Sequence, residues 1–422
     1  MATTSERYYN NEPEPESSER DQSGAIMVVQ LLDGKRTEDE FEEFRKSLEL
    51  QNRELKNEFE NKFIITNNEY KPGIKTKVYP DYSEYEGQFV SGSREGKGIL
   101  YLGPNEVYFG EWENDTLNGY GVYIFPNGER YEGEFRNGMR HGHGKYIFYN
   151  GNYYDGEWSD GEKHGEGTYY MFGTDEKYVG EYKNGIREGK GIFYFAFGDV
   201  YEGDFYNNMK HGRGRLIYKN GDVYDGDWVE EIANGQGEME YKNGDYYSGG
   251  WIEGIKHGMG IYQYADGSKF EGEFFDGIRQ GIGTMSYPNG DSYHGDWRGD
   301  TRVGLGVYTY ADGSEYDGEW RDDDMNGRGE LFCANGNHYK GTWRNGMFDG
   351  EGVMVYQNGD IFQGYWIAGE KNGEGSYLWA SGQKFHGRWK DDEMHGKGRL
   401  ISELGDFEVS FHFGRMIEKK KV

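Results

Sequence analysis

The sequence is poor in several residue types on which ordinary globular domains depend. It has one cysteine and 7 prolines in 422 residues, and Leu, Ile, Val and Phe together make up less than a fifth of it. A lone cysteine, Cys333, excludes an intramolecular disulfide and is typical of a reducing compartment. No apolar run approaches the roughly 18 residues that a membrane-spanning helix needs. Residues 1–22 are acidic and polar, unlike a secretory or transit signal, so we expect a cytoplasmic protein.

Positive charge is also scarce. Lys and Arg number 47 against 76 Asp and Glu, which gives a net charge of −29. This balance argues against nucleic acid as a partner and disfavours docking on an anionic membrane. The one basic run, residues 419–421, is interpreted as a solubilising tail. Few aliphatic residues and high charge are typical of disorder, but 38 Tyr, 24 Phe and 10 Trp can build a core instead.

The 70 glycines follow a repeat. The pattern aromatic-x-Gly-x-aromatic recurs every 23 residues, with one step of 24, and a Gly-x-Gly follows eleven residues after each start. The extra residue falls between Met171 and Lys177, which we expect to be a connection. The repeats begin at Tyr85, Tyr108, Tyr131, Tyr154, Tyr178, Tyr201, Tyr224, Tyr247, Phe270, Tyr293, Tyr316, Tyr339, Phe362 and Phe385.

Each repeat has the pattern of a β-hairpin. In the repeat that begins at Tyr131, aromatic residues and Gly133 alternate with glutamates, which is the period of a strand with one buried face. Asn137-Gly138 offers the positive φ of a tight turn, and a second strand begins at the Gly-x-Gly. We expect the glycines to make room for aromatic rings of adjacent repeats.

The repeat resembles the MORN (membrane occupation and recognition nexus) family, whose unit reads roughly YxGxWxxGxxHGxG. The segments YDGEWSDGEKHGEG at Tyr154 and YSGGWIEGIKHGMG at Tyr247 match it. The resemblance implies an all-β fold: an elongated, twisted, single-layer antiparallel sheet of about 14 tandem hairpins with an aromatic groove. Its 28 strands at about 4.8 Å each would span about 135 Å. We predict a disordered acidic tail over 1–24, an N-terminal cap and linker over 25–81, the array over 82–404, and a degenerate cap with a basic tail over 405–422.

The segment before the repeats predicts a helix. Thr37-Glu38-Asp39-Glu40 forms a capping box, and apolar residues follow at helical spacing, so we expect a helix over 37–62. It follows an apolar stretch at 25–32 that could be a strand or a helix start. The helix either caps its own repeats or binds a partner, for example as a coiled coil in a homo-oligomer.

Three features suggest chemistry that we do not expect. Histidines precede the Gly-x-Gly in five repeats, but equivalent positions lie about 9.6 Å apart, too far to share a zinc ion. The Gly-x-Gly pairs lie between two strands rather than between a strand and a helix, so no phosphate site is predicted. Cys333 takes the place of a residue such as Tyr149 and is predicted to be inert. We expect no metal, cofactor or catalytic residue.

An acidic column occupies the position between the repeat glycine and the second aromatic, on the face opposite the rings, and we interpret it as a solvated surface. It stops in the last three repeats, where Lys340 and Arg388 stand on the same face; this is either a second contact surface or drift. The column comprises Glu111, Glu134, Glu157, Glu181, Asp204, Asp227, Glu273, Asp296 and Glu319.

The sequence predicts a scaffold rather than an enzyme. The resemblance implies an axonemal component of cilia or flagella, similar to radial-spoke head proteins, that binds extended or helical segments of cytoskeletal partners. The alternatives are a cytoskeleton–membrane tether that binds phospholipid and an enzyme with a regulatory repeat section, for which too few non-repeat residues remain. The predicted partner-binding residues are Tyr108, Trp112, Tyr131, Phe135, Tyr154, Trp158, Tyr224, Trp228, Tyr247, Trp251, Tyr293, Trp297, Tyr316, Trp320, Tyr339, Trp343, Lys340 and Arg388.

Overall fold

The computed structural model describes residues 36–66 and 69–422, so the predictions for residues 1–24 and 25–32 lie outside the described residues. The chain divides into two compact units. The first comprises residues 1–186 and 193–198, and the second comprises residues 187–192 and 199–422. Strand β13 (Ile186–Tyr194) has residues in both.

The first unit holds the helix and an antiparallel sheet in which each strand from β3 to β12 pairs with the next. Helix α2 (Glu38–Phe59) continues into the π-helical turn η1 (Glu60–Ile64), and β1 (Ile65–Thr66) pairs with β2 (Glu69–Tyr70). The sheet strands are β3 (Ile74–Val78), β4 (Glu84–Val90), β5 (Ser93–Gly103), β6 (Glu106–Glu113), β7 (Thr116–Ile124), β8 (Arg130–Arg136), β9 (Met139–Ile147), β10 (Tyr153–Ser159), β11 (Glu162–Met171) and β12 (Glu176–Lys183).

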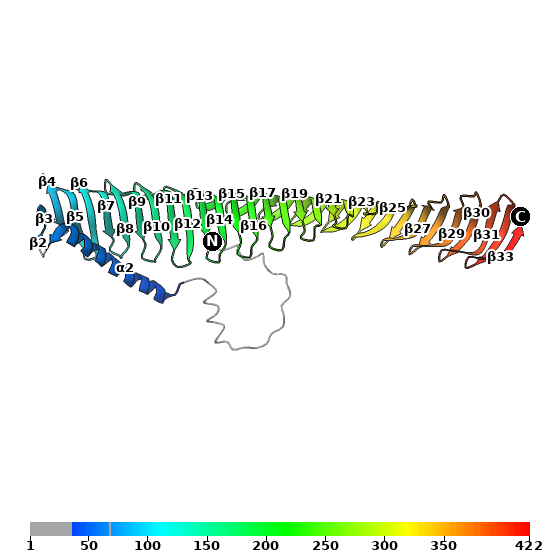
Figure 1. Ribbon diagram of the computed structural model, residues 1–422, viewed down its shortest axis with the longest axis horizontal. Coiled ribbons are helices and arrows are strands. Elements are labelled where there is room, and N and C mark those ends of the chain that lie inside the picture. The colour runs from blue at the N-terminus through cyan, green and yellow to red at the C-terminus, as the bar shows by residue number, and fades with distance from the viewer. Residues whose placement is uncertain (1–35, 67–68) are drawn as a thin grey trace, which may run out of the picture. The chain divides into compact units, whose positions relative to one another are not determined.

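The second unit is an antiparallel sheet in which the strands from β14 to β33 also pair in chain order. Figure 1 shows these strands rotating progressively along the unit, which is the twist expected of a long sheet. The strands are β14 (Val200–Tyr206), β15 (Met209–Ile217), β16 (Val223–Val229), β17 (Ile232–Glu240), β18 (Tyr246–Ile252), β19 (Ile255–Gln263), β20 (Lys269–Phe275), β21 (Ile278–Ser286), β22 (Ser292–Arg298), β23 (Thr301–Thr309), β24 (Glu315–Arg321), β25 (Asp324–Phe332), β26 (His338–Arg344), β27 (Met347–Val355), β28 (Ile361–Ile367), β29 (Glu370–Leu378), β30 (Lys384–Lys390), β31 (Glu393–Ser402), β32 (Gly405–His412) and β33 (Arg415–Lys421).

The hairpins form as the repeat predicts. Asn137 and Gly138 connect β8 to β9 with φ values of 51° and 80°, which is the left-handed conformation of a tight turn. This hairpin also contains a bulge directly after its first glycine, between Gly133 and Phe135, and hairpins such as β10–β11 and β16–β17 have the same bulge.

The repeat tyrosine lies flat over the paired glycines of its own hairpin. A Cβ atom at Gly144 would stand 2.3 Å from the hydroxyl oxygen of Tyr131, and one at Gly133 would stand 2.4 Å from the Cα atom of Gly144. The Tyr131 hydroxyl donates to the carbonyl of Glu134 at 2.8 Å. The glycines therefore make room for a ring of the same repeat, and the expectation that they accommodate adjacent repeats is corrected. We call the sheet face that carries these rings the inner face and the opposite one the outer face.

Helix α2 begins at the predicted capping box. The Thr37 hydroxyl accepts the backbone N–H of Glu40 at 3.3 Å, and the Glu40 carboxylate accepts the N–H of Thr37 at 2.7 Å. Leu48 is buried with 3% of its surface exposed. The helix ends within the predicted range, and its apolar side packs on the chain's own sheet, which is the first of the two alternatives that the sequence left open.

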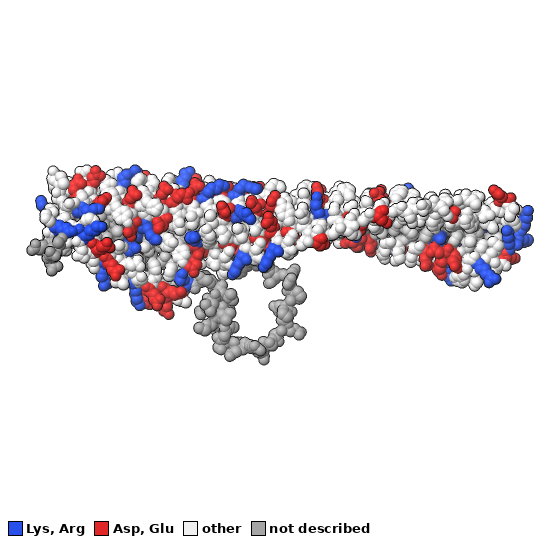
Figure 2. All heavy atoms as spheres, viewed as in Figure 1, with Lys and Arg blue, Asp and Glu red and all other residues white. Residues whose placement is uncertain are grey.

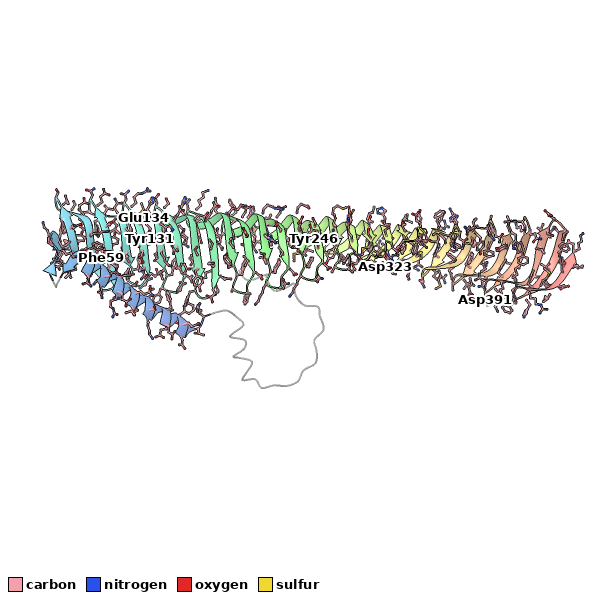
Figure 3. The ribbon with its side chains drawn as sticks, viewed as in Figure 1. Phe59, Tyr131, Glu134, Tyr246, Asp323 and Asp391 are labelled. Carbon is pink, nitrogen blue, oxygen red and sulfur yellow. The ribbon has the colours of Figure 1, made fainter. Side chains whose placement is uncertain are left out.

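The helix crosses the outer face of the first unit (Figure 1). At its end, Phe59 lies 5.4 Å from the ring of Phe109 on β6, and Ile64 joins an apolar cluster with Ile99 and Val122 (Figure 3). At its start, Phe41 and Phe44 pack on Phe172. Other members of the cluster are Val107, Ile124, Leu55, Phe63, Ile65, Ile74 and Tyr101. Under the helix, the outer face therefore carries apolar residues at positions where other repeats carry charged ones.

The one inserted residue of the array lies in the turn that receives the start of the helix. This turn joins β11 to β12, and its Phe172 carbonyl accepts from the Arg36 guanidinium at 2.9 Å. Arg36 also pairs with Asp175 at 2.9 Å, and its N–H donates to the carbonyl of Gly173 at 3.1 Å. The insertion thus widens a turn into a docking site for the helix.

Asn52 anchors the middle of helix α2 to the sheet, and we expect its replacement to weaken the docking of the helix. Its amide donates to the carbonyl of Gly128 at 3.1 Å and accepts from Arg130 at 3.0 Å, and both side chains are 6% exposed. Burial lowers the pKa of Arg130. We expect Asn52→Ala to weaken helix docking by about 1–3 kcal/mol, because it leaves buried polar groups without partners.

Hydrogen exchange of residues 38–59 measures this effect. Protection there should fall while protection of β14–β33 stays unchanged. Gln51→Ala, an exposed change on the same helix, is the matched control and should leave protection as it is. Equal losses in the two variants would contradict the assigned role of Asn52.

The C-terminal segment forms one more hairpin rather than a strand and a tail. β32 pairs with β31 through Val409 opposite Gly398, and β33 pairs with β32 through Lys421 opposite Phe407. The basic run of residues 419–421 is therefore in a strand, which corrects the predicted tail. Among the described residues β33 has no second neighbour, and lysines on such an edge strand disfavour further pairing. Figure 2 shows basic atoms gathered at this end of the second unit.

Candidate binding faces of the sheet

The predicted partner-binding aromatics form a buried ladder on the inner face. The Tyr131 ring meets Phe135 of its own repeat at 5.0 Å and Trp158 of the next at 5.4 Å, both edge-on. The Trp158 indole N–H donates to the carbonyl of Gly144 at 2.8 Å. The same alternation of first and second repeat aromatics continues within each unit. Edge-to-face contacts of this kind stabilise aromatic pairs beyond their buried area.

These rings are not available to a partner as they lie in the structure. All sixteen predicted aromatic side chains are between 0 and 8% exposed, so the expectation of exposed rings is wrong. Alternation along a strand assigns a face, but the depth of a side chain depends on what covers it. The Tyr131 ring, for example, is covered by Phe135 and Trp158, and the Arg140 guanidinium stands 4.3 Å from the Trp158 ring. Direct contact between these sixteen residues and a partner stays a prediction.

A second aromatic row on the inner face is only half-buried. It occupies the position seventeen residues after the repeat start, where the second strand enters the turn, and it is interrupted by Cys333 in the repeat that begins at Tyr316. In the second unit Tyr310 packs 4.7 Å from Tyr308, whose hydroxyl donates to Asp291 at 2.8 Å. Burial raises the pKa of Tyr310. We call this set the tyrosine row; its members are Tyr218, Tyr241, Tyr264, Tyr287, Tyr310, Tyr356 and Trp379.

Basic side chains lie over several of the inner-face rings, an arrangement that we did not predict from the sequence. The Arg302 guanidinium stands 4.5 Å from the ring of Trp320, and its Nη donates to the Asp323 carbonyl at 2.8 Å. Burial lowers the pKa of Lys210 and Lys256 at the equivalent position. The signal was present: Arg or Lys recurs nine residues after the repeat start, at Arg94, Arg140, Lys163, Arg187, Lys210, Lys256, Arg279, Arg302 and Lys371.

The acidic column of the outer face has a structural role. The Glu134 carboxylate accepts the backbone N–H of His143 at 3.1 Å and thereby closes the bulge (Figure 3). Asp227 and Asp296 accept the N–H groups of Gln236 and Leu305 at 2.8 Å and 2.9 Å. The column is therefore part of the hairpin as well as a solvated surface.

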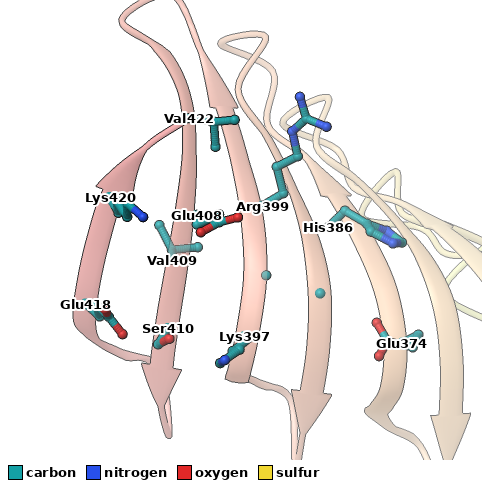
Figure 4. Close-up of a pocket in the computed structure, with 12 residues that line it drawn as sticks. Glu374, His386, Lys397, Arg399, Glu408, Val409, Ser410, Glu418, Lys420 and Val422 are labelled. Atoms are coloured by element: carbon teal, nitrogen blue, oxygen red, sulfur yellow. The ribbon is translucent and has the colours of Figure 1, made fainter.

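The outer face changes in the last repeats, as the sequence indicates. Lys340 pairs with Glu330, and Arg388 pairs with Glu374 at 3.0 Å. Their side chains are 68% and 72% exposed, so both are accessible. A hollow of about 510 Å³ lies on the strands from β29 to β33 (Figure 4). Its side chains carry both charges: Glu374, Glu408 and Glu418 with His386, Lys397, Arg399 and Lys420.

The other candidate groups show no convergence on a site. Within residues 36–66 and 69–422, no three His, Cys, Asp or Glu side chains are placed to share a metal ion. His257 packs on Phe275 at 5.0 Å. Cys333 is equivalent to Phe148 rather than to Tyr149, because the backbone N–H groups of Cys333 and Phe148 close equivalent turns, by donating to the carbonyls of Asn337 and Asn152. Burial raises the pKa of the Cys333 thiol. In that same part of the chain no helix is long and apolar enough to cross a membrane.

The repeats match a known family throughout. The MORN repeat pattern matches fourteen segments: residues 85–104, 108–130, 131–153, 154–171, 178–200, 201–223, 224–246, 247–269, 270–292, 293–315, 316–338, 339–361, 362–384 and 385–403. The chain belongs to the MORN repeat family. The matched segments of this MORN protein start at the tyrosines and phenylalanines that lie over the paired glycines. The aromatic and glycine positions that define the family are thus the positions that form the buried ladder.

Comparisons with whole proteins give only weak similarity. No curated protein sequence matches this MORN protein. The TCP10 domain of Danio rerio CPAP, in complex with a peptide of STIL, is 12% identical, with a TM-score of 0.33 over 53% of this chain and 100% of that one. The TCP domain of Drosophila melanogaster SAS-4, in complex with a proline-rich motif of Ana2, is 20% identical, with a TM-score of 0.24 over 36% and 81%. Similarity at this level transfers no function.

Proposed function

We propose that this MORN protein is a non-catalytic scaffold that binds segments of partner proteins along the inner face of its sheet. The observation that carries this proposal is the tyrosine row. Its rings are half-buried, they recur in five successive repeats from Tyr218 to Tyr310 and again at Tyr356 and Trp379, and the buried ladder lies beside them in the same strands. Rings on a rigid support provide contact area at low entropic cost, as in interface hot spots.

The partner segment is extended or helical and follows the row. Successive rings stand two strands apart, about 9.6 Å, so a partner that crosses the strands meets one ring per repeat. The basic side chains beside the row, such as Arg279 and Arg302, are 17% and 18% exposed and form ion pairs with Asp300 and Asp323. A segment with aromatic or apolar groups fits this surface.

We further propose that the partners belong to the axoneme of cilia or flagella. This step rests on the resemblance to MORN proteins of radial-spoke heads, and the extent of the array supports it, since matched repeats run from residue 85 to residue 403. Binding of phospholipid in a cytoskeleton–membrane tether is the alternative. The net charge of −29 argues against that alternative at an anionic membrane.

Loss of three rings of the row should release the protein from axonemes. We expect tagged wild-type protein to remain with detergent-extracted axonemes, and the combined change Tyr264→Ala, Tyr287→Ala and Tyr310→Ala to lower the retained fraction about tenfold. Each ring removed from an interface can weaken binding by more than 1 kcal/mol. Quantitative immunoblotting of the extracted and soluble fractions measures the effect.

Two controls separate binding from folding and from location. Phe332→Ala with Tyr365→Ala removes rings that are 45% and 47% exposed elsewhere in the second unit, and should leave retention unchanged. Circular dichroism should show the same sheet content in all variants. Complete release of the wild type would exclude the axonemal proposal, and flotation of the wild type with phosphoinositide liposomes would favour the tether.

A further inference from the structure

The outer face of the second unit carries a row of exposed apolar residues. Met259 on β19, Ile282 on β21 and Leu305 on β23 occupy the same position in three successive repeats, and they are 63%, 57% and 65% exposed. The repeats on either side have Gln236 and Arg328 there. We call the three residues the apolar stripe. Hydrophobic residues that gather on a solvated face, rather than lie scattered, mark interaction surfaces.

Acidic residues alternate with the stripe. Met259 pairs across the strands with Glu273, Ile282 with Asp296, and Leu305 with Glu319. Adjacent strands are about 4.8 Å apart, so apolar groups recur about every 9.6 Å with a carboxylate between them. A complementary partner therefore presents apolar side chains at that spacing and basic side chains in the intervals.

Helix α2 of this chain shows how a helix can contact successive hairpins on the outer face. Three α2 residues at seven-residue intervals contact successive parts of the first unit: Phe59 meets Phe109 at 5.4 Å, Asn52 meets Arg130 at 3.0 Å, and Arg45 meets Tyr149 at 4.7 Å. Seven residues of an α-helix rise about 10.5 Å, close to the 9.6 Å of one hairpin. A helix that crosses the strands can therefore place one contact on each repeat.

We propose that the apolar stripe docks an amphipathic helix of a partner protein, with apolar residues at every seventh position and Lys or Arg between them. The acidic residues of the stripe select the basic flanks. The helix α2 of this chain is not the occupant, because its apolar side is buried in the first unit, with Leu48 3% exposed. The proposal concerns the outer face and does not depend on the inner-face binding proposed above.

A synthetic helical peptide tests the proposal with the full chain. The probe is a fluorescent 22-residue peptide with Leu at every seventh position and Lys in the intervals. We expect binding in the micromolar range by fluorescence anisotropy, with a gain of peptide helicity by circular dichroism. Ile282→Arg with Leu305→Arg should weaken binding at least tenfold, because it removes apolar area and adds like charge. The fold should tolerate arginine, since Arg213 and Arg328 occupy the equivalent position.

Matched controls decide the outcome. Ile367→Arg changes a residue that is 60% exposed on β28, outside the stripe, and should leave the dissociation constant within twofold. A peptide of the same composition with Leu at every fifth position should bind at least tenfold more weakly. Equal binding of the two peptides, or an equal loss in Ile367→Arg, would overturn the proposal. So would a wild-type dimer that the double arginine variant dissociates, or tighter binding of a polyproline peptide with Leu at every third position.

Discussion

Gly144→Ala should destabilise its hairpin by about 3 kcal/mol. A Cβ atom there would lie 2.3 Å from the hydroxyl oxygen of Tyr131 and 2.5 Å from the ring carbon that bears it. Tyr131 is completely buried, and edge-on rings hold it on both sides, so it cannot move aside. Overpacking of a fixed core costs about 1–3 kcal/mol, and this contact involves the backbone of two paired strands.

Hydrogen exchange measures the loss repeat by repeat. A change of about 3 kcal/mol corresponds to roughly a hundredfold faster exchange of the protected amides in β8 and β9. Because repeats contact only their neighbours, amides in β14–β33 should keep their protection. Gly103→Ala is the matched control, since no atom lies within 4 Å of its Cβ position, and it should change stability by less than about 0.5 kcal/mol.

A double variant distinguishes the clash from a general intolerance of alanine. Tyr131→Ala alone should cost about 3–5 kcal/mol, as for other buried aromatics. In that background the ring is gone, so Gly144→Ala should cost less than about 1 kcal/mol. The two changes should therefore be strongly non-additive. Additive costs would contradict the assignment of the glycine to the ring above it.

Much of this architecture could be predicted from the sequence because the repeat states it fourteen times. The hairpins, their turns, the inserted residue and the capping box at Thr37 all follow from local patterns, and the structure has them. The exposure of the rings could not be predicted, because it depends on basic side chains such as Arg302 that fold over the ladder. The position of the helix on the sheet could not be predicted either. Its contacts Phe172 and Phe109 depart from the repeat pattern, and nothing in the sequence connects that departure to the helix. The basic run of residues 419–421 was predicted to be a tail because of its charge, but it forms the edge strand β33.

Trp320→Ala should produce a comparable loss, of about 3–5 kcal/mol, in the second unit. The indole is 6% exposed and stands edge-on between Tyr293 at 5.1 Å and Tyr316 at 5.4 Å. Its N–H donates to the carbonyl of Gly306 at 3.0 Å, and Arg302 lies over its ring. Alanine removes all of these contacts and leaves a cavity between two repeats.

The distribution of this loss along the chain tests whether the ladder couples the repeats. Trp320 bridges two hairpins, so exchange should quicken in β22–β23 as well as in β24–β25, and should fade beyond them. Ile367→Ala, a change at an exposed position, should cost less than about 0.5 kcal/mol. Exchange that quickened only in the strands of Trp320's own hairpin would show that the rings stabilise hairpins singly. Exchange that quickens in both hairpins would mean that Tyr293 couples the repeats, and such coupling is what a platform for a long partner segment requires.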